Sequence, residues 1–155
     1  MAKMEIDDRF SRFGTVGFTA TSRVNDFMGY LDEGRVMGTC CKTCKLDFFP
    51  PRADCSGCLG NDLSWFDAGE KTGSLLTFSK MKYGPKGFED DLPYTIAVVD
   101  FGSFKMFGRM SRDLEDEDIR IGMTLRVRAN PLEGGRINYV FHRAEPARDG
   151  ADINA

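Results

Sequence analysis

All five cysteines of the chain lie between Cys40 and Cys58, and four of them form two Cys-x-x-Cys pairs. Each pair can turn two sulfurs toward one point, and two such pairs complete a tetrahedron around zinc, with zinc–sulfur distances of about 2.3 Å. The spacing therefore predicts a metal site made by Cys41, Cys44, Cys55 and Cys58. Four protein ligands leave no open position for water or substrate, so the predicted zinc is structural and not catalytic.

Two other uses of these cysteines are considered. Iron in a rubredoxin-like site also suits four thiolates, and it would make the protein an electron carrier. A redox dithiol needs its Cys-x-x-Cys at the start of a helix, whereas both pairs here lie among extended segments, which disfavours that reading. Cys40 is an additional thiol, either a bystander or a substitute for Cys41, and the sequence leaves this choice open.

Other catalytic groups are sparse. The single histidine, His142, falls in a strand-like run and is interpreted as a partly buried structural residue. No phosphate-binding loop pattern is present, and with its cysteines committed to metal the chain has no nucleophile–base pair of its own. We therefore expect no stand-alone enzyme. The turn at residues 84–87, beside Lys82 and Tyr83, is a plausible place for an anionic ligand.

An amphipathic helix is predicted before the cysteines, over residues 21–34. Thr21 or Ser22 would cap it, and Gly34 would end it. Its apolar residues recur at i, i+3, i+4 and i+7 and form one stripe, which packs either on the protein's own core or on a partner. The stripe consists of Val24, Phe27, Met28 and Leu31.

Short extended runs separated by turn residues make up the rest of the chain. Three surround the cysteines, at residues 35–40, 45–51 and 63–69. Five more follow, at residues 74–83, 93–102, 103–111, 123–131 and 136–144. Five short strands without a long helix favour a small closed barrel of the OB type. The acidic segment 113–118 is interpreted as a solvated connection.

The predicted fold is mainly β, with an N-terminal helix, a four-cysteine zinc ribbon and a five-stranded OB-type barrel. The expected parts are an N-terminal arm and helix (1–34), the zinc ribbon (35–69), the barrel (70–145) and a C-terminal tail (146–155). No apolar run is long enough to span a membrane, and the N-terminus is charged, unlike a signal peptide. We expect a cytoplasmic protein, in which thiols stay reduced and bind metal.

Charge weighs against nucleic acid as the main ligand. The net charge is −3 and the pI is about 5.2, so the basic footprint that phosphate contacts require is missing. Zinc ribbons and OB barrels do often bind nucleic acid, which makes this the alternative function. The nearest stacking platform is the run 103–112, but strand alternation separates Phe104 from Lys105, Phe107 and Arg109.

The order of these elements resembles the acyl-CoA-associated zinc-ribbon/OB-fold proteins. The similarity covers roughly residues 22 to 143. Its most specific parts are the two Cys-x-x-Cys pairs, the Phe-Pro-Pro-Arg at 49–52 between them, and Gly73 before the first barrel strand. By this resemblance Cys41, Cys44, Cys55 and Cys58 are the zinc ligands, which leaves Cys40 outside the motif.

The resemblance implies a non-catalytic subunit of a hetero-oligomer. Members of the family bind thiolases, related condensing enzymes or acyl-CoA hydratases, and they shape or cover the partner's acyl-CoA site. The N-terminal arm is most similar to small subunits of thiolases in anaerobic aromatic degradation, such as benzoylsuccinyl-CoA thiolase. A coenzyme A thioester would then bind at the interface with the partner. Expected partner contacts are Phe27, Leu31, Phe49 and Arg52, and the expected acyl-CoA-facing loop contains Lys82, Tyr83 and Lys86.

Overall fold

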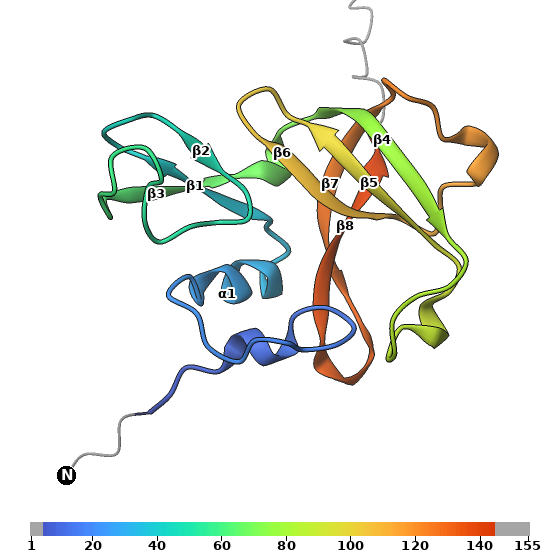
Figure 1. Ribbon diagram of the computed structural model, residues 1–155, viewed down its shortest axis with the longest axis horizontal. Helices are drawn as coiled ribbons and strands as arrows, with labels where there is room; N and C mark the ends of the chain where they lie inside the picture. Colours follow the sequence, from blue (N-terminus) through green and yellow to red (C-terminus); the bar gives the residue numbers. More distant parts are fainter. Residues whose placement is uncertain (1–4, 145–155) are drawn as a thin grey trace, which may run out of the picture.

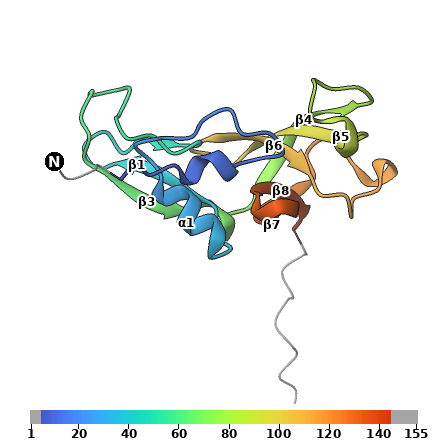
Figure 2. The same cartoon turned by 90° about the horizontal axis from the view of Figure 1, so that it is seen from below.

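Two small β structures stand side by side in the computed structural model, which describes residues 5–144 (Figure 1). The first is a three-stranded sheet around the cysteines, and the second is a closed five-stranded barrel. One short helix and an N-terminal arm lie against both, as the view from below also shows (Figure 2). The predicted fold class is therefore confirmed. The predicted tail, residues 146–155, lies outside the described residues.

The ribbon sheet has the strand order β2-β1-β3, with both pairs antiparallel. Its strands are β1 (Met37–Cys41), β2 (Asp47–Phe48) and β3 (Leu63–Asp67). The strands pack so closely that a Cβ atom on Gly38 of β1 would lie 2.4 Å from the Phe66 ring and 2.8 Å from the Phe48 carbonyl oxygen. Only glycine fits at this position of the sheet.

The barrel has the strand order β4-β5-β6-β8-β7 and closes through a short pairing of β4 with β7. β6 and β8 run parallel, whereas the other neighbours are antiparallel. Gly73 stands where β4 meets β5, and a Cβ there would lie 2.6 Å from a Val99 methyl carbon. The strands are β4 (Gly73–Met81), β5 (Tyr94–Asp100), β6 (Lys105–Met110), β7 (Thr124–Pro131) and β8 (Ile137–Arg143).

Alternating side chains fill the barrel, as the strand patterns predict. On β6 the outward Lys105 and Phe107 alternate with the buried Met106 and Gly108. The acidic segment predicted to be a solvated connection contains only a short 3-10 turn, Asp116–Asp118. The largest side chains that are almost completely buried inside the barrel are Leu75, Val99, Met106, Leu125, Val127 and Phe141.

The helix α1 spans Asp26–Asp32 and is shorter than the predicted 21–34. The expected cap at Thr21 or Ser22 is wrong. Ser22 Oγ accepts a hydrogen bond from the Val24 N–H in a turn that precedes the helix, and the capping residue Asn25 makes no side-chain capping bond. Gly34 does end the helix, with φ at +83° and its N–H bonded to the Leu31 carbonyl. No helix among residues 5–144 is long and apolar enough to cross a membrane.

The buried face of α1 belongs to the protein's own core. Phe27 and Leu31 are only 2% and 1% exposed. Phe10 and Phe13 from the arm and Phe49 from the ribbon pack around the Phe27 ring, with centroid distances of 6.0 to 6.2 Å. The expectation that Phe27 and Leu31 contact a partner is therefore corrected, because other parts of the same chain already cover them.

The N-terminal arm is held at several points along its length. Arg9 and Arg12 form ion pairs with Asp26 and Asp32 of α1. Farther along the arm, the Gly14 N–H donates to the Ile137 carbonyl oxygen, and Arg136 Nε donates back to the Gly14 carbonyl oxygen at 2.6 Å. The arm thus ties the helix to the hairpin between β7 and β8.

Candidate metal centre

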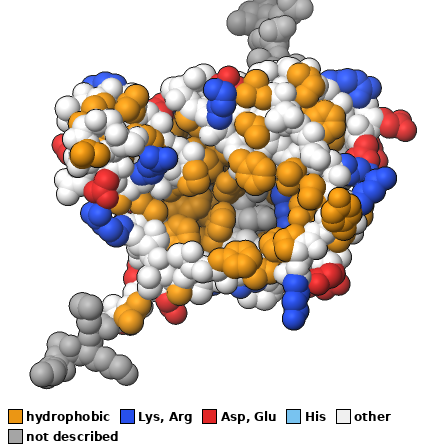
Figure 3. All heavy atoms as spheres, viewed as in Figure 1, with side chains coloured by type: hydrophobic (Ala, Val, Ile, Leu, Met, Phe, Trp, Pro, Cys, Tyr) orange, Lys and Arg blue, Asp and Glu red, His pale blue; other side chains and the backbone are white. Residues whose placement is uncertain are grey.

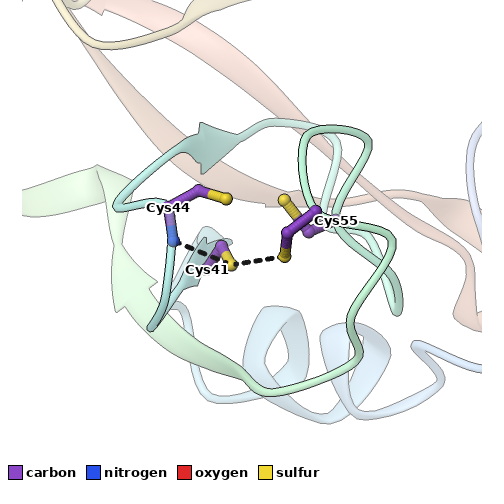
Figure 4. Close-up of side chains that lie close together, drawn as sticks. Cys41, Cys44 and Cys55 are labelled. Atoms are coloured by element: carbon purple, nitrogen blue, oxygen red, sulfur yellow. Dashed lines mark hydrogen bonds between the residues drawn. The ribbon is translucent and has the colours of Figure 1, made fainter.

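The sulfurs of Cys41, Cys44, Cys55 and Cys58 come together at one end of the ribbon, all within 4.8 Å of one another. Figure 4 shows the side chains of Cys41, Cys44 and Cys55 turned toward a common point. In a tetrahedral site with zinc–sulfur distances near 2.3 Å, neighbouring sulfurs are about 3.8 Å apart. The Cys41 and Cys58 sulfurs are 3.7 Å apart, so the geometry fits a four-thiolate zinc site.

The two cysteine turns have the same backbone hydrogen bonds. In the first, Lys45 N donates to Cys41 O at 2.9 Å, and in the second, Leu59 N donates to Cys55 O at 2.9 Å. Lys45 and Leu59 both have φ at +59°, a left-handed conformation uncommon for residues other than glycine. Neither is a glycine or an asparagine, so sequence reasoning had no signal for these two positions. The turns explain how each pair directs both sulfurs inward.

Backbone N–H groups support negative charge on two of the sulfurs. Cys44 N–H lies 3.3 Å from Cys41 Sγ, and this bond lowers the pKa of Cys41 to about 7. Gly57 N–H lies 3.3 Å from Cys55 Sγ in the second turn. The Cys58 side chain, in contrast, raises the pKa of Cys44 to about 12. Four thiolates this close repel one another, and a divalent cation removes that repulsion, so the donor set favours a bound metal.

Cys40 does not belong to this cluster. It precedes Cys41 on β1 and its side chain points to the other side of the strand, where Asp47 raises its pKa. The open question from the sequence is thereby answered in favour of Cys41. Within residues 5–144, the four-cysteine cluster is the one group of metal-binding side chains that the structure brings together.

The Phe-Pro-Pro-Arg segment connects the metal centre to the rest of the protein. Thr39 of β1, which is 3% exposed, accepts a hydrogen bond from Arg52 N–H at 2.8 Å and donates one to Arg52 O at 3.1 Å. Phe49 is half-buried and packs edge-on against Tyr139 of the barrel, with ring centroids 5.2 Å apart. The Arg52 side chain is exposed and lies over the Phe48 ring.

The loop predicted to face acyl-CoA joins β4 to β5. Lys82, Tyr83 and Lys86 are all exposed there, and Tyr83 is 82% exposed. Their role stays a prediction.

A groove of about 990 Å³ lies on the barrel between this loop and the β7–β8 hairpin, the region where OB folds bind oligonucleotides. Its best placed cation is already paired, because Arg109 Nη1 lies 2.8 Å from Asp91 Oδ2 and its guanidinium stacks on Tyr94. Thr15 of the arm donates to the same carboxylate. Burial alone would raise the pKa of Asp91, but these partners hold it below its usual value. The groove therefore offers phosphate little free positive charge.

His142 lies on the outer face of β8, partly buried, as expected for a structural residue. Burial and the charge of Arg128 lower its pKa, and the nearest carboxylate oxygen, on Asp113, is 4.0 Å away. It has no cysteine beside it, because β8 belongs to the barrel and the cysteines to the ribbon.

Comparison with known proteins agrees with the order of ribbon and barrel. Residues 29–64 match the model of the ChsH2 rubredoxin-like zinc ribbon domain, and residues 65–130 match that of the ChsH2 C-terminal OB-fold domain. The chain belongs to the ChsH2-type zinc-ribbon/OB-fold family. The predicted resemblance is therefore confirmed, and the zinc-ribbon match together with the four-cysteine cluster supports a structural zinc.

Two archaeal relatives are described as DUF35 domain-containing scaffold proteins. The one from Methanocaldococcus jannaschii is 30% identical over 88 residues, and the match covers 57% of this chain and 62% of that protein. The one from Pyrococcus furiosus is 28% identical over 116 residues, covering 72% and 84%.

Two solved structures share the fold. A chain of the Ltp2-ChsH2(DUF35) aldolase superposes with a TM-score of 0.66 at 23% identity, covering 81% of this chain and 98% of its own length. A DUF35-family protein of unknown function from Sulfolobus solfataricus gives 0.52 at 15% identity, covering 78% and 88%.

Proposed function

We propose that this protein is a non-catalytic accessory subunit of a heteromeric thiolase-type acyltransferase. In this role it stabilises the catalytic subunit and shapes or covers its acyl-CoA site. The observation that carries the proposal is the four-sulfur centre. Its cysteines bind one structural metal ion and are therefore not available as catalytic nucleophiles. The scaffold descriptions of the archaeal relatives and the enzyme complex that contains the ChsH2 chain support a partner-dependent role.

The loop with Lys82, Tyr83 and Lys86 is the proposed acyl-CoA-facing element. It carries two exposed cations and an exposed aromatic ring, a combination suited to phosphate and adenine groups of coenzyme A. Neither lysine has a carboxylate oxygen within 4.0 Å among the described residues. The charges are thus available to a ligand carried by the partner.

An aldolase partner is the second candidate, because the structural relative with the TM-score of 0.66 is part of an aldolase. Both candidates use a catalytic subunit and differ in how a carbon–carbon bond is cleaved: a thiolase uses attack by the coenzyme A thiol, whereas an aldolase releases an aldehyde or ketone by retro-aldol cleavage.

The test is co-expression of the chain with a thiolase subunit and, separately, with an aldolase subunit. We expect a stable complex with the thiolase, and thiolytic cleavage of a 3-oxoacyl-CoA by coenzyme A that is lower without the accessory chain. A complex active only in retro-aldol cleavage would support the second candidate. A thiolase that is fully active and stable alone, beside a monomeric accessory chain, would contradict the proposal.

A further inference from the structure

Half-buried aromatic side chains line the junction between the ribbon and the barrel. We call this group the aromatic seam. Its rings pack in sequence, with centroid distances of 6.1 Å from Phe13 to Tyr139, 5.2 Å from Tyr139 to Phe49, 6.3 Å from Phe49 to Phe104 and 5.1 Å from Phe104 to Phe101. The seam consists of Phe13, Phe49, Phe66, Phe101, Phe104 and Tyr139.

The seam is not fully covered by the chain itself. All of its members except Phe104 keep part of their surface accessible. Figure 3 shows a hollow lined by apolar side chains at the centre of this face, between the ribbon and the barrel, with Lys and Arg side chains around it. Exposed apolar surface gathered in one place is typical of an interaction site, whereas single exposed apolar residues are not.

Phe107 extends the apolar surface onto the outside of β6. Its side chain is 60% exposed, and its carbonyl oxygen accepts a hydrogen bond from the Tyr139 hydroxyl at 2.8 Å. The opposite residue on β5 is Val98, so the exposed ring stands beside another apolar side chain. Aromatic side chains of this kind often contribute most to the affinity of an interface.

Cations border the seam. Arg52 lies over the Phe48 ring next to Phe49, and Lys71 Nζ lies 4.8 Å from the centroid of Phe66. Lys105, the first residue of β6, directly follows Phe104 and precedes Phe107 by two residues, which places Lys105 and Phe107 on the same outer face.

Two of these three cations have no carboxylate within ion-pair distance among residues 5–144. Lys71 has Asp47 at 3.9 Å, but neither Arg52 nor Lys105 has a carboxylate oxygen within 4.0 Å among residues 5–144. Asp100 is opposite Lys105 in the strand register, yet its Oδ1 accepts the Gly102 N–H. Arg52 and Lys105 are therefore not held in ion pairs and can pair with carboxylates of another protein.

We propose that the aromatic seam and Phe107 form the docking surface for the catalytic subunit, which presents an apolar side chain flanked by carboxylates. The apolar side chain enters the hollow, and the carboxylates meet Arg52 and Lys105. Complementary charge around an apolar centre fixes the orientation of the partner and raises the association rate. The inference rests on the proposed function, because it requires a catalytic subunit to exist.

The experiment measures the affinity of the purified full-length chain for the co-expressed catalytic subunit, identified by mass spectrometry and by its own activity. Phe107→Asp should weaken binding about 10-fold or more. Ile121→Asp is the matched control, because Ile121 is 62% exposed but belongs to the turn before β7 and not to the seam. The control should bind like the unmodified chain.

Charge reversal tests the chemistry of the partner. The double variant Arg52→Glu, Lys105→Glu should bind about 10-fold more weakly at low salt. It should also lose most of the decrease in affinity that the unmodified chain shows between about 0.05 and 0.5 M NaCl. Circular dichroism and zinc content, unchanged in all three variants, show that the fold is retained.

The outcomes separate the two proposals. If the unmodified chain binds no catalytic subunit, the proposed function fails. If it binds one and the Phe107 variant binds equally well, or if Ile121→Asp is impaired as much, the docking surface is wrong while the function stands. A photo-crosslinker at position 107 that captures a partner peptide rich in Lys and Arg would overturn the predicted acidic flank.

Discussion

Replacing Thr39 with valine removes the hydroxyl that holds the Phe-Pro-Pro-Arg segment to β1. Valine has nearly the same shape, so the change leaves no cavity, but Arg52 N–H and Arg52 O lose their hydrogen-bond partner. A buried polar group without a partner costs about 1–3 kcal/mol. Because the Arg52 residue is exposed, water can replace part of this loss, and we expect a total decrease of about 1–3 kcal/mol in the free energy of unfolding.

Thr39→Ser is the matched control. It keeps the hydroxyl and removes one buried methyl group, which costs about 1 kcal/mol. Urea unfolding at fixed pH and fixed zinc concentration measures both variants. The single tryptophan, Trp65, reports on the right part of the protein, because it is paired with Thr39 across β1 and β3. A valine variant as stable as the unmodified protein, or a serine variant less stable than the valine one, would refute this account of the hydroxyl.

Two more changes test the metal centre and the barrel. Cys58→Ser should release zinc and unfold the ribbon while the barrel keeps its β structure. Native mass spectrometry measures the bound zinc, and the control variant Cys40→Ser should retain it. A Cys58→Ser variant that still binds zinc would contradict the assignment. His142 is held neutral, because burial and Arg128 lower its pKa from the unfolded value of 6.5. Its contribution to stability is therefore complete above about pH 6.5 and is lost as the pH falls below it. His142→Gln should flatten the dependence of the urea midpoint on pH between about 5 and 7.5, and an unchanged slope would show that other groups cause it.

The strands and the metal centre could be predicted because their signals are local. Each strand has its own alternation, as between Lys105 and Met110, and the cysteine spacing alone defines the four-sulfur cluster. The environment of the helix was harder to predict. Its apolar stripe is present in the sequence, but whether Phe27 faces a partner depends on Phe10 and Phe49, which come from other parts of the chain.

Two features of the site had no signal in the sequence. Lys45 and Leu59 adopt a left-handed backbone without being glycine, because the paired turns around the sulfurs impose it. The ion pair between Arg109 and Asp91 also could not be predicted from the local sequence, because it joins β6 to the loop before β5. Thr15 of the arm donates a further hydrogen bond to the same carboxylate.

The bonds between the arm and the β7–β8 hairpin bear on the order in which the protein can fold during synthesis. Arg12 donates to a carbonyl oxygen 123 positions away and Arg136 to one 122 positions away, so these two bonds can form only after the last hairpin has been made. All four sulfur ligands, by contrast, emerge before the first barrel strand. A nascent chain can therefore bind its metal before the arm can contact the β7–β8 hairpin. The bonds between the arm and this hairpin form only after the whole barrel has been synthesised.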